Sequence, residues 1–353
     1  MRLALDIRPI DTLFFRDARP FEQASQASTG LPTPQTLAGA LRTTLLERHG
    51  IDWDRVADGV RRHGSVHRSL TSIGHEPAAV AAVSVRGPWI RRRDEVLLPV
   101  PANLRKTNDG PLIRLDPLRS ELPGWRPHAP GMLPLWRYGR KSMKALKPDT
   151  FIRPEGQEKF LHGSIPDAST LVQGEDLYQY DVRTGIGMDA ASGTVSEGLI
   201  YSAQHLVLRQ HVSFYAEVAG SERALSPLLN TTVLMRFGGE GRCVQVSASK
   251  TLYAWPGAPG HTKRGKLLLL TTPVAVDGWK SAGLDLISAA VGKPRAVSGW
   301  DMALGGPKPN RFMVPAGTVY FLSERARVPS CLGSEEDSQI GWGHFLEGIW
   351  SYV

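Results

Sequence analysis

The sequence has little cysteine and no long apolar run. Its two cysteines, Cys243 and Cys331, form no CxxC pair and have no histidine nearby. This argues against a disulfide framework and against a structural zinc site, and it favours a reducing compartment. No apolar stretch reaches the ~18 residues that a membrane-spanning helix needs. We therefore expect a cytoplasmic protein that does not cross a membrane.

The sequence also lacks the common catalytic motifs. Its ten histidines show neither HxH nor HExxH spacing, and no GxSxG or GxxxxGK[ST] motif is present. The acidic run Glu335–Asp337 is typical of a solvated loop rather than an acid/base pair. His67, His211 and His344 remain candidates for the general acid or base of a metal-free RNA cleavage. The sequence therefore favours binding over catalysis, with no cofactor and no metal ion.

Positive charge is in excess, and most of it lies in one region. The 353 residues carry a formal net charge of +8, with 41% hydrophobic and 22% charged residues. This is the composition of a folded protein of about two domains with a polyanionic partner. Residues 91–160 hold 15 Lys and Arg against 8 Asp and Glu, and ten prolines there argue against long helices.

The densest part of this basic region interleaves cations with aromatic rings. Tyr138 is surrounded by basic side chains at Arg137, Arg140, Lys141, Lys144 and Lys147. Such a segment can neutralise phosphates and stack on unpaired bases. An irregular insertion kept in solution by its charges would have the same composition, so both interpretations stay open.

The stretch Leu13–Arg42 follows a strand pattern and leads into a helix pattern. Leu3, Leu5 and Ile7 alternate with polar residues, as in a strand with one buried face. Thr33 is a candidate helix cap, Pro34 suits the first helical turn, and an apolar stripe continues to Gly50. The intervening loop carries Arg16 and Arg19 beside phenylalanines, and Arg42 lies at the edge of the helix stripe. These three arginines can hold an anion, or they can be ordinary solvated or salt-bridged residues.

The rest of the chain predicts short strands and helices in alternation. Residues 51–74 are either helical or a basic connection, and residues 78–85 are either a buried strand or a helix end. We expect one long strand over 201–218, helices over 226–234 and 282–291, a strand over 267–276, and a strand pair formed by 297–302 and 318–322. A glycine loop precedes a terminal strand after residue 339. This order predicts an α+β fold with helices on one face of a sheet.

Three glycine clusters stand near basic residues. They are RTGIGMDAASGTVSEGLIY with Arg183, RFGGEGR with Arg242, and GWGHFLEG with Gly341, Gly343 and His344. Glycine lets the backbone approach a ligand closely, so that its amides can face phosphate oxygens. One such loop usually makes only a turn, but three beside cations favour an anion-binding surface.

Together these segments resemble a known family. FFRDARPF, LPTPQTLAGALR, RTGIGMDAASGTVSEGLIY, RFGGEGR, KPNRFMVPAGTVYF and QIGWGHFLEG follow one another as in the RAMP-type subunit that caps the guide RNA in the Cmr (type III-B) CRISPR effector complex. The resemblance extends from residue 13 to residue 348. GALR and the RTGIG segment are the parts most specific to this subunit.

The resemblance implies two ferredoxin-like, RRM-type domains, which we place at residues 1–174, with the basic insertion at 91–160, and at 175–353. It implies a non-catalytic subunit of a multi-protein complex that binds the 5′ repeat-derived tag of the crRNA. Its protein partners would be the large polymerase/cyclase-like Cas subunit and an adjacent backbone RAMP subunit. A metal-independent RAMP endoribonuclease that processes repeat RNA is the alternative.

By position, the resemblance assigns the N-terminal basic motif to Arg16, Arg19 and Arg42, and the C-terminal glycine loop to Gly341, Gly343 and His344. Charge alone adds Arg137, Arg140, Lys141 and Lys144 of the insertion. Proximity to the glycine clusters adds Arg183 and Arg242.

Overall fold

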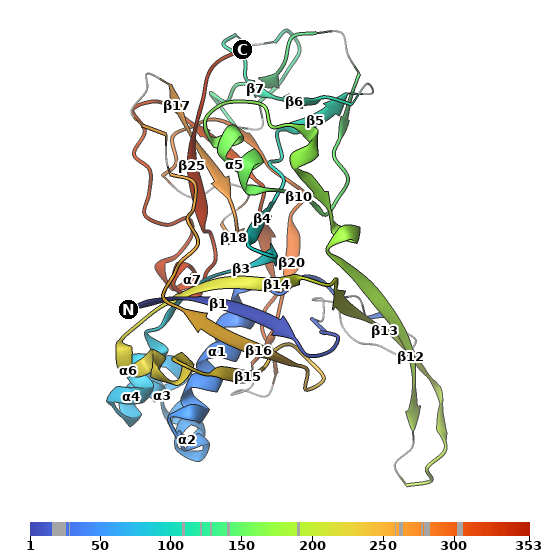
Figure 1. Ribbon diagram of the computed structural model, residues 1–353, viewed down its shortest axis with the longest axis vertical. Helices are drawn as coiled ribbons and strands as arrows, with labels where there is room; N and C mark the ends of the chain where they lie inside the picture. The colour runs from blue at the N-terminus through green and yellow to red at the C-terminus, as the bar shows by residue number, and fades with distance from the viewer. Residues whose placement is uncertain are drawn as a thin grey trace. The chain divides into compact units, whose positions relative to one another are not determined.

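The computed structural model describes residues 1–15, 26–27, 29–107, 110–120, 122–127, 129–139, 142–188, 191–257, 259–260, 264–276, 278, 283–301 and 306–353. The chain forms two compact units (Figure 1). Unit 1 comprises Met1–Pro88, Tyr178–Leu252 and Ala296–Arg311, and unit 2 comprises Trp89–Leu177, Tyr253–Arg295 and Phe312–Val353. Each unit takes segments from both sides of residue 174, so the compact units do not follow the linear division expected between residues 174 and 175.

Unit 1 combines a sheet with a group of helices. Its elements are β1 (Arg2–Pro9), β2 (Gln26–Ala27), α1 (Pro34–Arg48), α2 (Trp53–His63), α3 (Val66–Ile73), α4 (His75–Ala81), the start of β3 (Ser84–Arg92), β12 (Tyr178–Met188), β13 (Val195–Leu208), β14 (Val212–Ala219), α6 (Glu222–Leu225), η3 (Ser226–Leu228), β15 (Thr232–Arg236), β16 (Cys243–Ser249), β21 (Trp300–Asp301) and β22 (Gly306–Pro307). The strand β20 (Arg295–Val297) begins at the boundary between the units.

The sheet of unit 1 has the strand order β3-β14-β1-β16-β15. The register places Leu3, Leu5 and Ile7 of β1 beside the apolar residues Val218, Ala216 and Phe214 of β14. Directly paired residues share a face, so this face is the buried one. The helices α1 to α4 lie together on one side of these strands (Figure 1). The sequence predicted β1 and α1 correctly, including the Thr33 cap, whose side chain accepts a hydrogen bond from the Thr36 amide.

Unit 2 contains a second antiparallel sheet, of order β19-β24-β17-β25. Its elements are β4 (Glu95–Pro99), β5 (Leu104–Thr107), β6 (Leu112–Arg114), β7 (Asp116–Pro117), β8 (Leu135–Trp136), β9 (Met143–Ala145), β10 (Thr150–Ile152), α5 (Pro154–Leu161), η1 (Ala168–Thr170), β11 (Leu171–Gln173), η2 (Gly174–Asp176), β17 (Gly265–Leu270), β18 (Val274–Ala275), β19 (Leu286–Ala290), β23 (Arg311–Val314), β24 (Val319–Leu322), α7 (Glu335–Gln339) and β25 (Phe345–Trp350). All four side chains of Leu267–Leu270 are fully buried, so the central strand β17 has apolar contacts on both faces.

The basic, proline-rich region folds as predicted, without long helices. Between residues 93 and 153 the described residues form only the short strands β4 to β10, and α5 begins at Pro154. The two regions left open are also settled. Residues 51–74 contain the helices α2 and α3, and residues 78–85 contain the end of α4 and the start of β3.

Two strand predictions were wrong: one joined two separate strands into one, and the other paired two segments that do not pair in the described part of the chain. The region 201–218 is two strands, β13 and β14, because the polar residues Arg209–His211 turn the chain and His211 adopts φ 63°. The segments 297–302 and 318–322 do not pair within the described residues. Strand β24 instead lies between β17 and β19, since those apolar strands bury its four side chains.

Both short helices predicted in the second half were wrong. Residues 286–290 form strand β19, because pairing with β24 outweighs the helix preference of Ala289 and Ala290. The predicted helix 226–234 is one 3-10 turn, η3, followed by strand β15. The acidic run 335–337 was expected as a loop but forms the first turn of α7, where the Ser334 hydroxyl caps the Asp337 amide at 3.1 Å.

Candidate nucleic-acid interface

Phe15 and Thr29, which stand on either side of the arginine-bearing sequence 16–25, are hydrogen-bonded to each other in unit 1. The Phe15 amide donates a 2.8 Å hydrogen bond to the Thr29 hydroxyl, which donates back to the Phe15 carbonyl at 3.2 Å. Just before it, Leu13 exchanges backbone hydrogen bonds of 2.8 and 2.7 Å with Leu206 of β13. Arg16 and Arg19 lie outside the described residues. The residues that flank them are buried and firmly bonded.

The RFGGEGR cluster is a tight hairpin turn between β15 and β16. Glu240 and Gly241 have φ of 56° and 65°, and the Arg242 amide donates to the Gly239 carbonyl at 3.3 Å, as in a type I′ turn. The Gly239 amide in turn donates to the Phe14 carbonyl at 2.8 Å. A Cβ atom on Gly238 would stand 2.5 Å from the same carbonyl. The turn therefore needs glycine in order to lie against Phe14.

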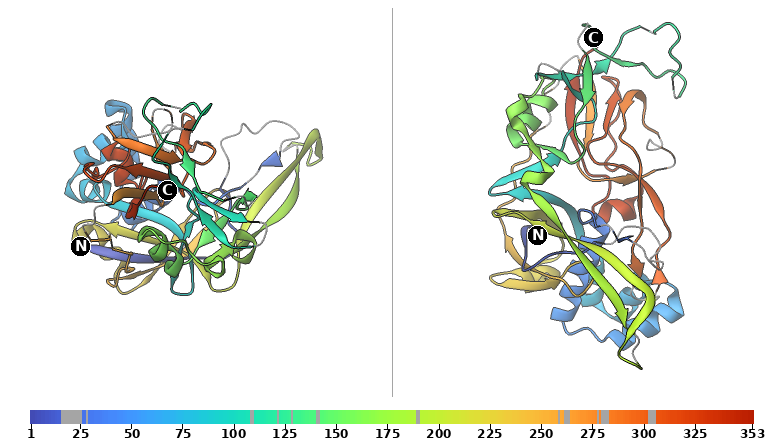
Figure 2. Two further views of the ribbon diagram at one scale, coloured as in Figure 1. Left: turned by 90° about the horizontal axis from the view of Figure 1, so that it is seen from above. Right: turned by 90° about the vertical axis from the view of Figure 1, so that its right-hand side faces the viewer.

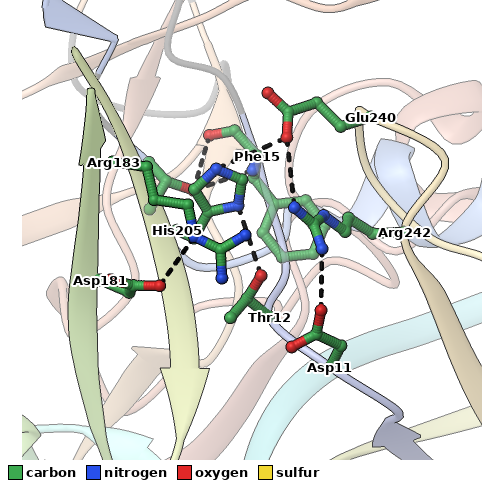
Figure 3. Close-up of polar contacts among 9 residues, drawn as sticks. Asp11, Thr12, Phe15, Asp181, Arg183, His205, Glu240 and Arg242 are labelled. Atoms are coloured by element: carbon green, nitrogen blue, oxygen red, sulfur yellow. Dashed lines mark hydrogen bonds and ion pairs between the residues drawn. The ribbon is translucent and has the colours of Figure 1, made fainter. Parts of the chain in front are cut away.

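A polar network ties this turn to β13 and to the end of β1 (Figure 3). Arg242 Nη1 lies 2.9 Å from Asp11 Oδ2, and its Nη2 lies 3.5 Å from Glu240 Oε2. The same Glu240 oxygen lies 3.5 Å from His205 Nε2, and His205 Nδ1 lies 3.4 Å from the Thr12 hydroxyl. We call Asp11, Thr12, His205, Glu240 and Arg242 the anchor network. It joins three chain segments beside the point where the segment 16–25 begins.

Burial within the protein favours the neutral form of His205. Its side chain is 3% exposed and stacks near Phe14, with ring centroids 5.3 Å apart. Burial lowers the pKa of His205, and the Glu240 carboxylate opposes this shift only in part. The Thr12 hydroxyl can donate to Nδ1 of the neutral ring, and Nε2 lies 3.5 Å from the Glu240 carboxylate. The anchor network thus functions at neutral pH without a charged imidazole.

Arg242 serves this network, although the sequence proposed it as an RNA ligand. Its side chain is 19% exposed, its two terminal nitrogens face Asp11 and Glu240, and its Nε is buried with no hydrogen-bond partner in the described part of the chain. Its charge is therefore compensated within the protein. The sequence signal that could have indicated this is Glu240, two residues before Arg242, whereas only the fold brings Asp11 to the turn.

Arg42 also forms a hydrogen bond within the protein. From α1 its Nη2 donates to the Val83 carbonyl at 2.8 Å, just before β3. Burial lowers the pKa of this guanidinium, which is half-buried. Arg42 thereby fixes the helix to the strand that follows the helical group.

Arg183 lies on the long β12–β13 hairpin, which runs as a two-stranded ribbon in every view (Figures 1 and 2). Its Nε donates to Asp181 Oδ2 at 2.8 Å, and 45% of its side chain is exposed. Large apolar side chains are exposed along the same hairpin at Tyr180, Val182, Ile186, Met188 and Val195. The described part of the hairpin is therefore an accessible ribbon with one cation and several apolar side chains.

The C-terminal glycine loop in unit 2 uses its amides internally. The Gly341 amide donates to Ser338 O at 3.1 Å, and the Gly343 amide donates to Pro273 O at 2.8 Å. The His344 amide donates to the Thr272 hydroxyl at 2.9 Å. These amides do not face outward toward a phosphate. Among the predicted residues of this loop, only the half-buried His344 presents a side chain.

The basic insertion places two lysines side by side. Lys106 of β5 pairs directly with Lys144 of β9, and both side chains are exposed. Like charges at paired positions repel each other unless an anion lies between them. Arg137 and Tyr138 are exposed in the same unit, whereas Arg140 and Lys141 lie outside the described residues. The sequence analysis missed Lys106, because only the strand pairing brings it to Lys144.

The histidines considered for catalysis do not share an environment. His67 is exposed on α3, and His211 is exposed in the turn between β13 and β14, both in unit 1. His344, in unit 2, has its Nδ1 2.7 Å from the Thr271 hydroxyl. In the part of the chain that the structure describes, no group of three His, Cys, Asp or Glu residues has the arrangement of a metal site. Nor does any described helix have the length and apolar character needed to cross a membrane.

Solved structures of other proteins share the fold of this chain. The chain shares its fold with chains in two cryo-EM structures of the type III-B Cmr-beta complex, one bound to cognate target RNA and AMPPnP and one bound to cognate target RNA. They are 16% and 15% identical to it, both with a TM-score of 0.55, and the matches cover 97% and 98% of this chain and 96% of each of those chains. No curated protein matches the sequence.

A family model places the chain more specifically. The model described as CRISPR-associated protein (Cas_Cmr3) matches residues 5–350. The chain therefore belongs to the Cas_Cmr3 family, and the resemblance to the Cmr RAMP-type subunit is confirmed.

Proposed function

We propose that this protein is a non-catalytic guide-RNA-binding subunit of a type III-B effector complex. In this role it recognises the 5′ repeat-derived tag of the crRNA and bridges the large subunit to the backbone subunits. The structural observation that carries the proposal is the pair of hydrogen bonds between Phe15 and Thr29, the residues on either side of the sequence that contains Arg16 and Arg19. Family membership and the net charge of +8 support it.

The geometry refines how the RNA would be held. Arg16 and Arg19 would contact phosphates, and the anchor network would fix the position from which their segment starts. Arg242 and Arg42 would act through the fold, since their guanidiniums bond within the protein. The exposed pair Lys106 and Lys144, with Arg137, Arg140 and Lys141, would supply a second cationic contact that depends on salt concentration.

We also propose that both units contain a ferredoxin-like arrangement. In unit 1 the strands β1, β3, β14 and β16, numbered one to four along the chain, lie in the spatial order 2-3-1-4. In unit 2 the strands β17, β19, β24 and β25 have the same order. Reversed, this is the 4-1-3-2 order of a βαββαβ fold, which commonly presents single-stranded RNA-binding surfaces.

The test is fluorescence anisotropy of a labelled guide RNA, with and without its 5′ tag, across a salt series. Each sample is then run on a denaturing gel. We expect preference for the tagged RNA, intact RNA on the gel, and loss of affinity in the Arg16→Ala/Arg19→Ala variant. The matched control is Arg61→Ala/Arg223→Ala, which removes two exposed arginines from helices of unit 1.

The subunit is measured alone and assembled with the other subunits of its complex. Equal affinity for tagged and untagged RNA in both settings would overturn tag recognition. Site-specific cleavage in EDTA would instead establish the alternative, a metal-independent endoribonuclease.

A further inference from the structure

The rings of Trp89, Tyr253 and His344 lie around Trp255 in unit 2. The ring centroids of Trp89 and Trp255 lie 4.6 Å apart, and those of Tyr253 and Trp255 lie 4.9 Å apart. The His344 ring lies 5.3 Å from Trp89 and 5.8 Å from Trp255. Trp255 therefore touches each of the other three rings. We call these four residues the aromatic cluster.

The aromatic cluster has a fixed base and a partly open rim. Trp89 is 3% exposed, and its indole Nε1 donates to the Thr271 carbonyl at 3.2 Å. The Thr271 hydroxyl lies 2.7 Å from His344 Nδ1, so one residue positions both rings. Tyr253, Trp255 and His344 are only half-buried. Three of the four rings therefore keep partial contact with solvent.

Tyr253 brings no charge to the rim of the aromatic cluster at neutral pH. Burial, and then the nearby Glu95 carboxylate, raise the pKa of Tyr253 to about 12, so its phenol stays protonated at neutral pH. Glu95 itself is held by Arg153, with bonds of 2.6 Å and 3.1 Å from the guanidinium to its two oxygens. The carboxylate therefore does not present an uncompensated negative charge beside the rings.

We propose that Trp255, with Tyr253 and His344, forms a stacking site for one unpaired base of the guide RNA. The flat rings of a base fit beside half-exposed aromatic rings, and such stacking tolerates any base because each has a π-face. A protein partner fits less well, because an apolar docking surface requires a contiguous exposed patch. Next to Trp255 the chain has Pro256 and Gly257, which give little side-chain area. This inference rests on the proposed RNA-binding function and assigns it a base contact distinct from the cationic ones.

The test uses the full chain, alone and assembled with the other subunits of its complex, and guide RNA with 2-aminopurine at one tag position at a time. Stacking on the indole quenches 2-aminopurine fluorescence, so wild-type protein should quench one position selectively. Trp255→Leu keeps apolar volume but removes the π-face. We expect it to lower affinity about ten-fold and to abolish that quenching. Trp255→Phe should retain both, and Trp53→Leu, which removes an exposed tryptophan of α2, should have no effect.

The slope of affinity against salt separates this site from the phosphate contacts. Trp255→Leu should leave the slope unchanged, because no counterion is released by a stacked base. Wild-type protein that prefers tagged RNA yet quenches no position would overturn the stacking site and leave the proposed function intact; this readout needs no variant. The stacking site would also be overturned if the Trp255→Leu protein bound RNA with wild-type affinity, whether or not that variant assembles with its protein partners. Wild-type protein without preference for the tag would instead refute the proposed function itself.

Discussion

Gly265 at the start of β17 pairs directly with Trp350 at the end of β25. The indole of Trp350 lies over the glycine, so a Cβ atom on Gly265 would stand 2.2 Å from Trp350 Cε2. Trp350 Nε1 donates to the carbonyls of Lys266 and Leu322, at 3.0 and 2.9 Å, which prevents the ring from moving aside. Three strands of the unit 2 sheet, β17, β24 and β25, therefore meet at one side chain.

Substitution of this glycine should destabilise the protein. Gly265→Ala has to displace the Trp350 ring, and we expect a loss of ~1–3 kcal/mol in the free energy of unfolding, as for overpacked cores. The measurement is urea denaturation followed by tryptophan fluorescence. The control is Gly39→Ala in α1, where a Cβ atom meets nothing within 4 Å and the helix gains ~0.5–1 kcal/mol. Equal stability of Gly265→Ala and the wild-type protein would show that the indole can move.

The buried Arg114 should be essential to unit 2. Its guanidinium bonds to Asp116 at 2.9 Å, to the Phe160 carbonyl at 2.8 Å and to the Ile349 carbonyl at 3.0 Å. Arg114→Met removes the hydrogen-bonded partner of the half-buried Asp116 and leaves two carbonyls without their donor, and we expect it to cost about 3 kcal/mol in urea denaturation. Asp116→Asn in the same background should recover part of this loss, because it removes the buried charge.

The pH dependence of Arg114→Met gives an independent check. Burial raises the pKa of Asp116 in the folded protein, while Arg114 opposes that shift. Without Arg114 the folded-state pKa rises further above the unfolded value, so the native state binds the proton more tightly. The deficit relative to wild type should therefore shrink as the pH falls below 7 toward that pKa. A deficit independent of pH would contradict an uncompensated Asp116.

His205 should titrate below the usual histidine value of about 6.5. Burial lowers its pKa in the folded state, so the unfolded state binds the proton more readily and the contribution of His205 to stability declines as the pH falls through about 6.5. Glu240→Gln removes the charge that raises this pKa, and we expect a further decrease. NMR titration of the imidazole measures the pKa of His205 in the wild-type protein and in Glu240→Gln. A pKa above the usual value in the wild-type protein would contradict the buried neutral ring.

Replacement of Lys106 should raise the stability of the protein and lower its affinity for RNA. Lys106→Gln relieves its repulsion with Lys144, so we expect the free energy of unfolding to rise by ~0.2–1 kcal/mol at low salt. RNA affinity should fall, and the slope of affinity against salt should decrease by about one phosphate contact. Lys159→Gln, which removes a lysine paired with Asp167, is the control. Unchanged RNA affinity and slope in Lys106→Gln would remove this lysine from the interface.

Local patterns were sufficient where neighbours in sequence are also neighbours in space. The Thr33 cap and the glycine turn before β16 depend mainly on residues close in the sequence, and the alternation of Leu3, Leu5 and Ile7 indicates a strand without identifying its partners. The helix predicted over 282–291 failed because β19 takes its hydrogen bonds from β24, a strand farther along the chain, and the helix predicted over 226–234 failed because β15 pairs with β16 across the glycine turn. Hydrogen bonding between two strands cannot be inferred from the residues of one short segment alone.

The sequence alone determined the α+β class, the positive charge, the absence of a recognisable catalytic motif and the family. These properties follow from composition, periodicity and motif order, which do not depend on tertiary packing. Only the tertiary structure decided which cations are available. Arg42 and Arg242 are held by a carbonyl and by carboxylates, whereas Lys106 comes to lie beside Lys144. The role of a charge depends on its distance to other charges, and that distance is set by the fold.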